Sequence, residues 1–141
     1  MTKDDLSRLV LVAGPPRSGT TWLHRELCKS DLAHGFLPEC TLVTQQVTLY
    51  SRTLNNCDAQ RFAAYFGTTA ALAEFYRDTI ARMLDLVVTL RRAPGPRTLV
   101  LKDPELSCVL AEAGDVMPAH RLVVLIRDPR DVVASVRKVT M

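Results

Sequence analysis

The chain has 141 residues, of which 48% are hydrophobic and 23% are charged, and its formal net charge is +3 at pH 7. This composition is typical of a globular protein, and the length predicts one domain, spanning residues 1–141, with a core of its own. The eighteen basic residues are scattered among fifteen acidic ones. We therefore expect no nucleic-acid partner, although a small anion pocket needs only a few well-placed cations.

The apolar run Leu9 to Ala13 is far too short for an export or membrane segment, and the polar residues before it do not resemble a secretory signal. The four cysteines contain no C-x-x-C pair, and the three histidines complete no zinc pattern. We therefore expect a cytoplasmic protein with reduced thiols, no membrane contact and no metal site.

Continuous apolar runs bounded by turn signals predict buried parallel strands at residues 9–13, 98–101 and 122–126. A further short strand is expected at residues 35–39, where it would end at a loop. Between the strands we expect helices, and the first should turn Trp22, Leu23 and Leu27 inward. The expected helices cover residues 19–29, 41–54, 58–66 and 69–90, a short segment through Leu110, and a last segment that starts at Asp128-Pro129.

Strands that alternate with helices predict the α/β class, with three layers (α/β/α) and a central parallel sheet covered on both faces. The long helix after Thr69 shows apolar residues at helical spacing, which indicates a helix packed on that sheet. Asp128 is a favourable N-cap residue, and Pro129 suits the first turn of the helix that follows.

A glycine-rich turn separates the first strand from the first helix. Gly14-x-x-x-x-Gly19 has the spacing of a phosphate-binding loop, in which glycines allow a tight turn and the first helix amides converge on an anion. A nucleoside triphosphatase would continue with lysine, and this chain has Thr20 there. Its cation comes earlier, at Arg17, whose guanidinium can bind phosphate or sulfate oxygens in a bidentate manner.

The segment from Pro16 to Leu23 resembles the 5′-phosphosulfate loop of sulfotransferases that use 3′-phosphoadenosine 5′-phosphosulfate (PAPS). The resemblance implies a P-loop-NTPase-like sulfotransferase fold and PAPS as donor co-substrate, without a metal. Many cytosolic members carry lysine at the position of Arg17, whereas tyrosylprotein-type and many bacterial members carry arginine. The donor-binding residues implied here are Arg17, Ser18, Gly19, Thr20, Thr21 and Trp22.

The segment from Arg127 to Ser135 resembles the 3′-phosphate motif of the same family. Arg127 follows a predicted parallel strand at the sheet edge where α/β proteins bind ligands. Ser135 lies about two turns along the next helix, and the resemblance implies that both residues bind the donor's 3′-phosphate. For Arg130 and Asp131 we expect a surface ion pair at the start of this helix.

Sulfuryl transfer requires a base for the acceptor's proton and cations near the transferring group. Lys102-Asp103-Pro104 resembles the Lys-(Asp/Thr)-Pro element of bacterial and tyrosylprotein-type members, which implies catalytic roles for Lys102 and Arg17. Cytosolic members use a histidine at the position of Pro104, so that mechanism is not indicated. By resemblance to tyrosylprotein-type members Glu39 is the predicted base, with Asp103 and Glu105 as the alternatives.

The predicted activity is transfer of a sulfuryl group from PAPS to a hydroxyl or amine acceptor. Carbohydrate, phenol, steroid, lipid and peptide tyrosine acceptors all stay open. The alternatives are a catalytically silent PAPS- or bisphosphate-binding or partner-binding remnant and, with less support, a P-loop phosphotransferase. Thr20 and the lack of a clear magnesium carboxylate count against a phosphotransferase.

Sulfotransferase domains continue beyond the 3′-phosphate helix, and this chain ends at Met141 without a helix-stop signal. We therefore expect a domain that is incomplete at its C-terminal side. The apolar surface left exposed there predicts self-association.

Overall fold

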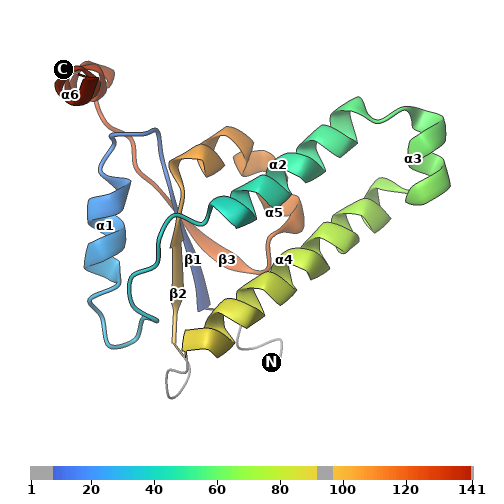
Figure 1. Cartoon of the computed structure of the whole chain (residues 1–141), viewed down its shortest axis with the longest axis horizontal. Helices are drawn as coiled ribbons and strands as arrows, with labels where there is room; N and C mark the ends of the chain where they lie inside the picture. The colour runs from blue at the N-terminus through green and yellow to red at the C-terminus, as the bar shows by residue number, and fades with distance from the viewer. Residues whose placement is uncertain (1–7, 92–96, 141) are drawn as a thin grey trace.

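The structure is a computed structural model that describes residues 8–91 and 97–140, with side chains through residue 137. Figure 1 shows a small sheet with α1 on one side and a long helical pair, α2 and α4, on the other. The elements in chain order are β1 (Leu9–Ala13), α1 (Thr20–Leu27), α2 (Thr41–Asn56), α3 (Ala59–Tyr65), α4 (Thr69–Arg91), β2 (Leu99–Lys102), the 3-10 helix η2 (Pro104–Val109), α5 (Leu110–Val116), β3 (His120–Val124) and α6 (Pro129–Thr140).

The sheet has three parallel strands in the order β2-β1-β3, so the first strand is central. Leu11 pairs with Leu101 on one side and with Leu122 on the other. The carboxyl ends of the strands therefore meet at one edge, where the loops after β1, β2 and β3 lie together. The predicted α/β class with a parallel sheet flanked by helices is confirmed.

Alternation along the strands divides the apolar side chains between two faces of the sheet. Leu9, Leu11 and Leu101 pack in the larger core with α2, α4 and α5. Val12 and Val100 form a smaller cluster with Ala33 and with Leu23 of α1. Both faces of β1 and β2 are therefore covered, as a fully apolar parallel strand requires.

The strand expected at residues 35–39 does not form, and that prediction was wrong. The segment has no regular secondary structure and follows a bridge between Ala33 and Thr98. Gly35 has a φ of 81°, which breaks the extended conformation. Pro38 has no N–H to donate to a ladder.

The first helix faces the sheet differently from the prediction. Trp22 is 67% exposed and Leu27 is also exposed, whereas His24 is fully buried and Leu23 is partly buried. His24 lies one turn after the buried Thr20, and positions four apart share a helix face. Its Nε2 donates to the carbonyl oxygen of Val100 at 3.0 Å, and its ring lies 4.8 Å from that of Phe36.

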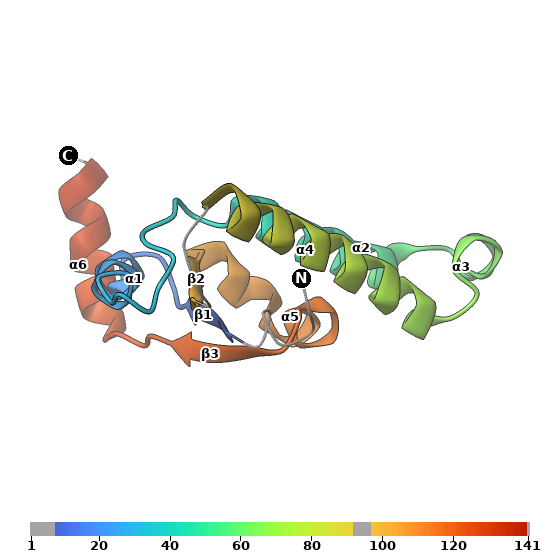
Figure 2. The same cartoon turned by 90° about the horizontal axis from the view of Figure 1, so that it is seen from below.

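The third strand departs furthest from expectation. It spans His120–Val124 rather than residues 122–126, and it is exposed instead of buried. Leu122, Val123 and Val124 are between 37% and 46% exposed. In Figure 2, β3 runs along the border of the molecule, and none of the described helices covers it as α2 and α4 cover β1 and β2.

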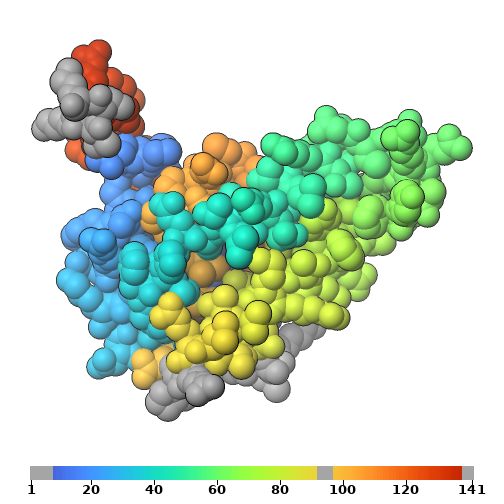
Figure 3. Space-filling model, viewed as in Figure 1, coloured from blue at the N-terminus to red at the C-terminus, as the bar shows by residue number. Residues whose placement is uncertain are grey.

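The long helix α4 buries Leu72, Tyr76, Ile80 and Leu84, which follow one another at four-residue spacing. The space-filling view in Figure 3 shows α2 and α4 side by side in an elongated arm, with α6 projecting at the opposite end. Within the described ranges, no helix combines the length and apolar character needed to cross a membrane.

Candidate functional site

The loop between β1 and α1 is shaped by two glycines. Gly14 has a φ of 152°, and a Cβ atom there would lie 2.5 Å from the carbonyl oxygen of Leu125. Gly19 has a φ of 99° and is the N-cap of α1. Ser18 N–H donates to the Pro15 carbonyl oxygen at 3.1 Å, which closes the turn between them. The loop therefore folds tightly against the segment that follows β3.

Arg17 also adopts a left-handed backbone conformation, with a φ of 70°. This conformation is uncommon for a residue with a side chain, and such positions concentrate where a site needs a particular geometry. The exposed Arg17 side chain reaches α6, where its Nε donates to Ser135 Oγ at 3.1 Å.

The loop contains hydrogen-bonding groups without partners. Ser18 Oγ is buried and has no hydrogen-bond partner among the described residues. The first amides of a helix have no intrahelical partner, and no side chain caps the N-terminus of α1. Buried polar groups are usually satisfied, and uncapped helix amides attract anions. These groups suit an anionic ligand.

Lys102 lies beside this loop because β2 pairs with β1. Val12 and Lys102 are register partners, so Lys102 ends its strand next to the residue that leads into the loop. Its side chain is only 3% exposed, and its Nζ lies 2.5 Å from Oε1 of Glu39, which is 53% exposed. The backbone bond from Cys40 N–H to the Lys102 carbonyl oxygen, at 3.0 Å, holds the segment that carries Glu39.

Asp103 and Glu105, the alternatives to Glu39 as the base, have different environments. Asp103 is buried, and its two oxygens accept from the Thr44 hydroxyl at 2.9 Å and from Glu105 N–H at 3.0 Å. It is the N-cap of η2, a structural position that the Thr44 partner reinforces. Glu105 is exposed and does not line the cavity described below. Of the three predicted base candidates, the structure brings Glu39 alone to that cavity.

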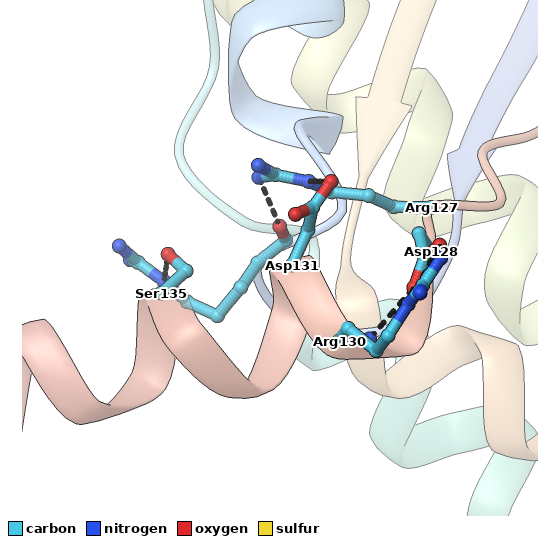
Figure 4. Close-up of polar contacts among 6 residues, drawn as sticks. Arg127, Asp128, Arg130, Asp131 and Ser135 are labelled. Carbon is cyan, nitrogen blue, oxygen red and sulfur yellow. Dashed lines mark hydrogen bonds and ion pairs between the residues drawn. The ribbon is translucent and has the colours of Figure 1, made fainter.

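The second motif meets the loop from the other side. Arg127 donates from Nη1 to the Arg17 carbonyl oxygen at 3.3 Å, and its Nε lies 3.8 Å from Asp131 Oδ2. Figure 4 shows Arg127 and Asp131 facing each other, while Ser135 lies one turn further along α6. The structure therefore joins two segments that are 110 positions apart in the sequence.

The predicted ion pair of Arg130 with Asp131 was wrong. Arg130 Nη2 lies 2.6 Å from Asp128 Oδ2 instead, and Figure 4 shows these two side chains together. Asp128 Oδ1 also accepts from Arg130 N–H at 2.9 Å, as expected of an N-cap. The bonds from Arg130 lower the pKa of the Asp128 carboxyl.

Together these residues line an open cavity of about 370 Å³. Arg17, Lys102 and Arg127 supply cations to its wall, and Glu39 supplies a carboxylate. The remaining lining residues are Pro16, Gly19, Thr20, Thr21, Pro104 and Ser135. Ser18 and Trp22 are the predicted site residues outside the lining: Ser18 is buried within the loop, and Trp22 is exposed.

The sequence indicated no role for Thr44 or His24. Thr44 orients Asp103 at the start of η2, and His24 fills the space under α1. Burial lowers the pKa of the His24 imidazole. Among the described residues, no group of three or more His, Cys, Asp or Glu side chains is arranged to hold a metal ion.

A search of curated proteins gave no match for this chain. The model of a family described as the sulfotransferase family matches residues 10–141. That range includes the β1–α1 loop, Glu39, Lys102 and the segment from Arg127 to Ser135. The chain therefore belongs to the sulfotransferase family.

Proposed function

We propose that this chain binds PAPS in the 370 Å³ cavity and transfers its sulfuryl group to a hydroxyl or amine acceptor. Membership of the sulfotransferase family supports the reaction class and the donor. One observation carries the proposal: the β1–α1 loop, the Lys102–Glu39 pair and the Arg127–Ser135 segment all line the same cavity.

The residues present fit a nucleotide that bears a phosphosulfate and a separate phosphate. The lining holds three cations and one carboxylate, an excess of positive charge that favours a multiply charged anion. Ser18 Oγ and the first amides of α1 add unpaired donors at the loop. The α1 amides gain a partner when an anion lies against the loop.

We assign the two ends of the donor to different parts of the cavity. Arg17 and the α1 amides hold the phosphosulfate end, where the loop folds against β1. Arg127 and Ser135 hold the 3′-phosphate at the start of α6. Arg17 belongs to both regions because its side chain contacts Ser135 while its carbonyl oxygen accepts from Arg127.

Lys102 and Glu39 are the proposed catalytic pair. PAPS supplies an activated sulfuryl group with a bisphosphate as its leaving group. The Lys102 ammonium donates hydrogen bonds to negative charge that develops on that group. Glu39 uses Oε1 for Lys102, and Oε2 has no partner among the described residues, so we assign to Oε2 the role of taking the proton from the acceptor's hydroxyl or amine.

Two measurements on the full chain test the proposal. Adenosine 3′,5′-bisphosphate should bind in calorimetry with a chelator present, because the proposed contacts need no metal. Labelled sulfate from PAPS should then appear on an acceptor drawn from a panel of phenols, sugars and amines. Binding without transfer to any acceptor would indicate a silent nucleotide-binding module, and absence of binding would overturn the proposal.

A further inference from the structure

A second cavity, of about 270 Å³, lies between the start of α2 and the C-terminal half of α4. Leu101 of β2 forms part of its wall, and the segment before α2 contributes Leu37. The wall is almost entirely apolar, with Glu39 as its one charged side chain. The other lining residues are Pro38, Cys40, Leu42, Val43, Met83, Leu84, Leu86 and Val87.

This cavity adjoins the donor cavity through Glu39, which lines both. Two neighbouring residues of β2 line different cavities: Lys102 lines the donor cavity and Leu101 lines the apolar one. Successive strand residues point to opposite faces, so β2 itself separates the two spaces. The Glu39 carboxylate therefore stands where a charged chamber and an apolar chamber meet.

The apolar wall offers little to a polar ligand. Cys40 is its most polar neutral member, and burial raises the pKa of the Cys40 thiol to about 12, so the thiol stays protonated. A sugar placed here would leave most of its hydroxyls without partners, and each unpaired buried group costs about 1–3 kcal/mol. An apolar ring would instead gain from leaving water.

We propose that this cavity holds the apolar part of the acceptor, and that the acceptor is a phenol or alcohol carried on a ring system, with its hydroxyl directed at Glu39. An apolar cavity of about 150 Å³ takes benzene, so about 270 Å³ accepts a substituted ring or two fused rings. That this cavity binds an apolar ligand is argued from its lining residues alone. Its role as the acceptor site rests on the proposed function.

The test uses 1-naphthol as probe, with fluorescence titration of the full chain in the presence of adenosine 3′,5′-bisphosphate. Leu42→Glu and Leu86→Glu place a charge in the cavity wall. Both residues are more than half exposed, so neither change disturbs the core. Leu49→Glu on α2 and Leu90→Glu on α4 are matched controls, because both are at least half exposed and lie outside the lining.

Leu42→Glu and Leu86→Glu should each weaken 1-naphthol binding about tenfold or more, because each removes apolar contact and adds a charge. The two controls should bind it normally, and methyl β-glucoside should not compete. Equal weakening in the controls, or unchanged affinity in both cavity variants, would overturn the inference.

The direction of the hydroxyl has its own measurement. 1-Methoxynaphthalene keeps the rings and lacks the O–H, so 1-naphthol should bind about tenfold more tightly, the value of a hydrogen bond to a charged group. Glu39→Ala should abolish that preference; if the preference persists, the hydroxyl does not face Glu39. If the bisphosphate fails to bind while 1-naphthol still depends on Leu42 and Leu86, the proposed function falls and the apolar site stands.

Discussion

Arg17 donates from Nε to the hydroxyl of Ser135 at 3.1 Å, although 118 positions separate the two residues in the chain. Arg127 strengthens this connection by donating to the carbonyl oxygen of Arg17. The loop after β1 and the helix after β3 therefore touch through the same side chains that the proposal assigns to the two ends of the donor.

The first prediction concerns those arginines. Arg17→Ala and Arg127→Ala should each weaken binding of adenosine 3′,5′-bisphosphate by about tenfold or more, because each removes a charge-assisted contact worth about 1.5 kcal/mol or more. Arg130→Ala is the matched control, since Arg130 pairs with Asp128 and does not line the cavity. Calorimetry that finds all three variants alike would contradict the assignment.

The second prediction separates a base from a structural carboxylate. Glu39→Gln should keep bisphosphate binding at least as tight as in the unmodified chain, because it removes the charge that competes for Lys102. It should slow sulfate transfer by about a hundredfold or more, the usual contribution of a positioned general base. The glutamine amide oxygen can still accept from Lys102, so the free energy of unfolding should fall only by the difference between a charged and a neutral partner for this buried lysine.

Asp103→Asn should act on stability rather than on the transfer step. Loss of the buried charged partner of Thr44 should lower the free energy of unfolding by about 1.5–3 kcal/mol, measured by urea denaturation. Normal turnover in Glu39→Gln would exclude Glu39 as the base.

The third prediction is a pH dependence of stability. Burial lowers the pKa of His24 below its ordinary value of 6.5, so the unfolded chain binds a proton that the folded chain rejects. Stability is then fully present above pH 6.5 and is lost as the pH falls below it, by up to about 1.4 kcal/mol per pH unit.

Urea denaturation between pH 7.5 and 5 should show this slope, and His24→Gln should reduce it. Burial also lowers the pKa of His34, so the double variant His24→Gln/His34→Gln should be flatter still. A single variant with the wild-type slope would show that His24 does not titrate as its burial implies.

The fourth prediction concerns β3. Leu122, at 44% exposure, lies on the edge strand β3, and Ile126, at 89%, lies two residues after it. Exposed apolar side chains at a strand edge promote association between copies. Sedimentation velocity should show a concentration-dependent increase in size, and Leu122→Lys and Ile126→Lys should suppress it. Leu32→Lys is the control, since Leu32 is an exposed leucine, at 69%, in the segment between α1 and α2. Association unaffected by the β3 changes would place the contact elsewhere.

Much of the fold could be predicted because its signals are local. The apolar runs of β1 and β2 and the glycines of the loop each depend on neighbours in sequence. The prediction failed where tertiary context decides. Trp22 was expected inside because it is apolar, but the burial of His24 fixes which face of α1 meets the sheet.

Within the candidate site, the proposed residues come from the resemblance, and the structure adds the contacts that each of them makes. No local sequence pattern predicts that Arg130 pairs with Asp128 rather than with Asp131, because both carboxylates lie in the same helix turn as Arg130. The apolar cavity was also absent from the sequence prediction. Its wall combines α2, α4 and β2, and no spacing rule connects Leu42 with Leu86.

The contact between Lys102 and Glu39 has a consequence for selectivity among cellular salts. The Glu39 carboxylate is the counter-ion of Lys102. An anion that binds Lys102 must therefore interact with it more strongly than this carboxylate does. Chloride does not meet that condition, whereas a ligand anchored at several points does. We therefore expect potassium chloride to weaken bisphosphate binding less steeply than it would at an exposed cluster of cations without a counter-ion. Lys102 would then bind the multiply charged nucleotide in preference to small monovalent anions.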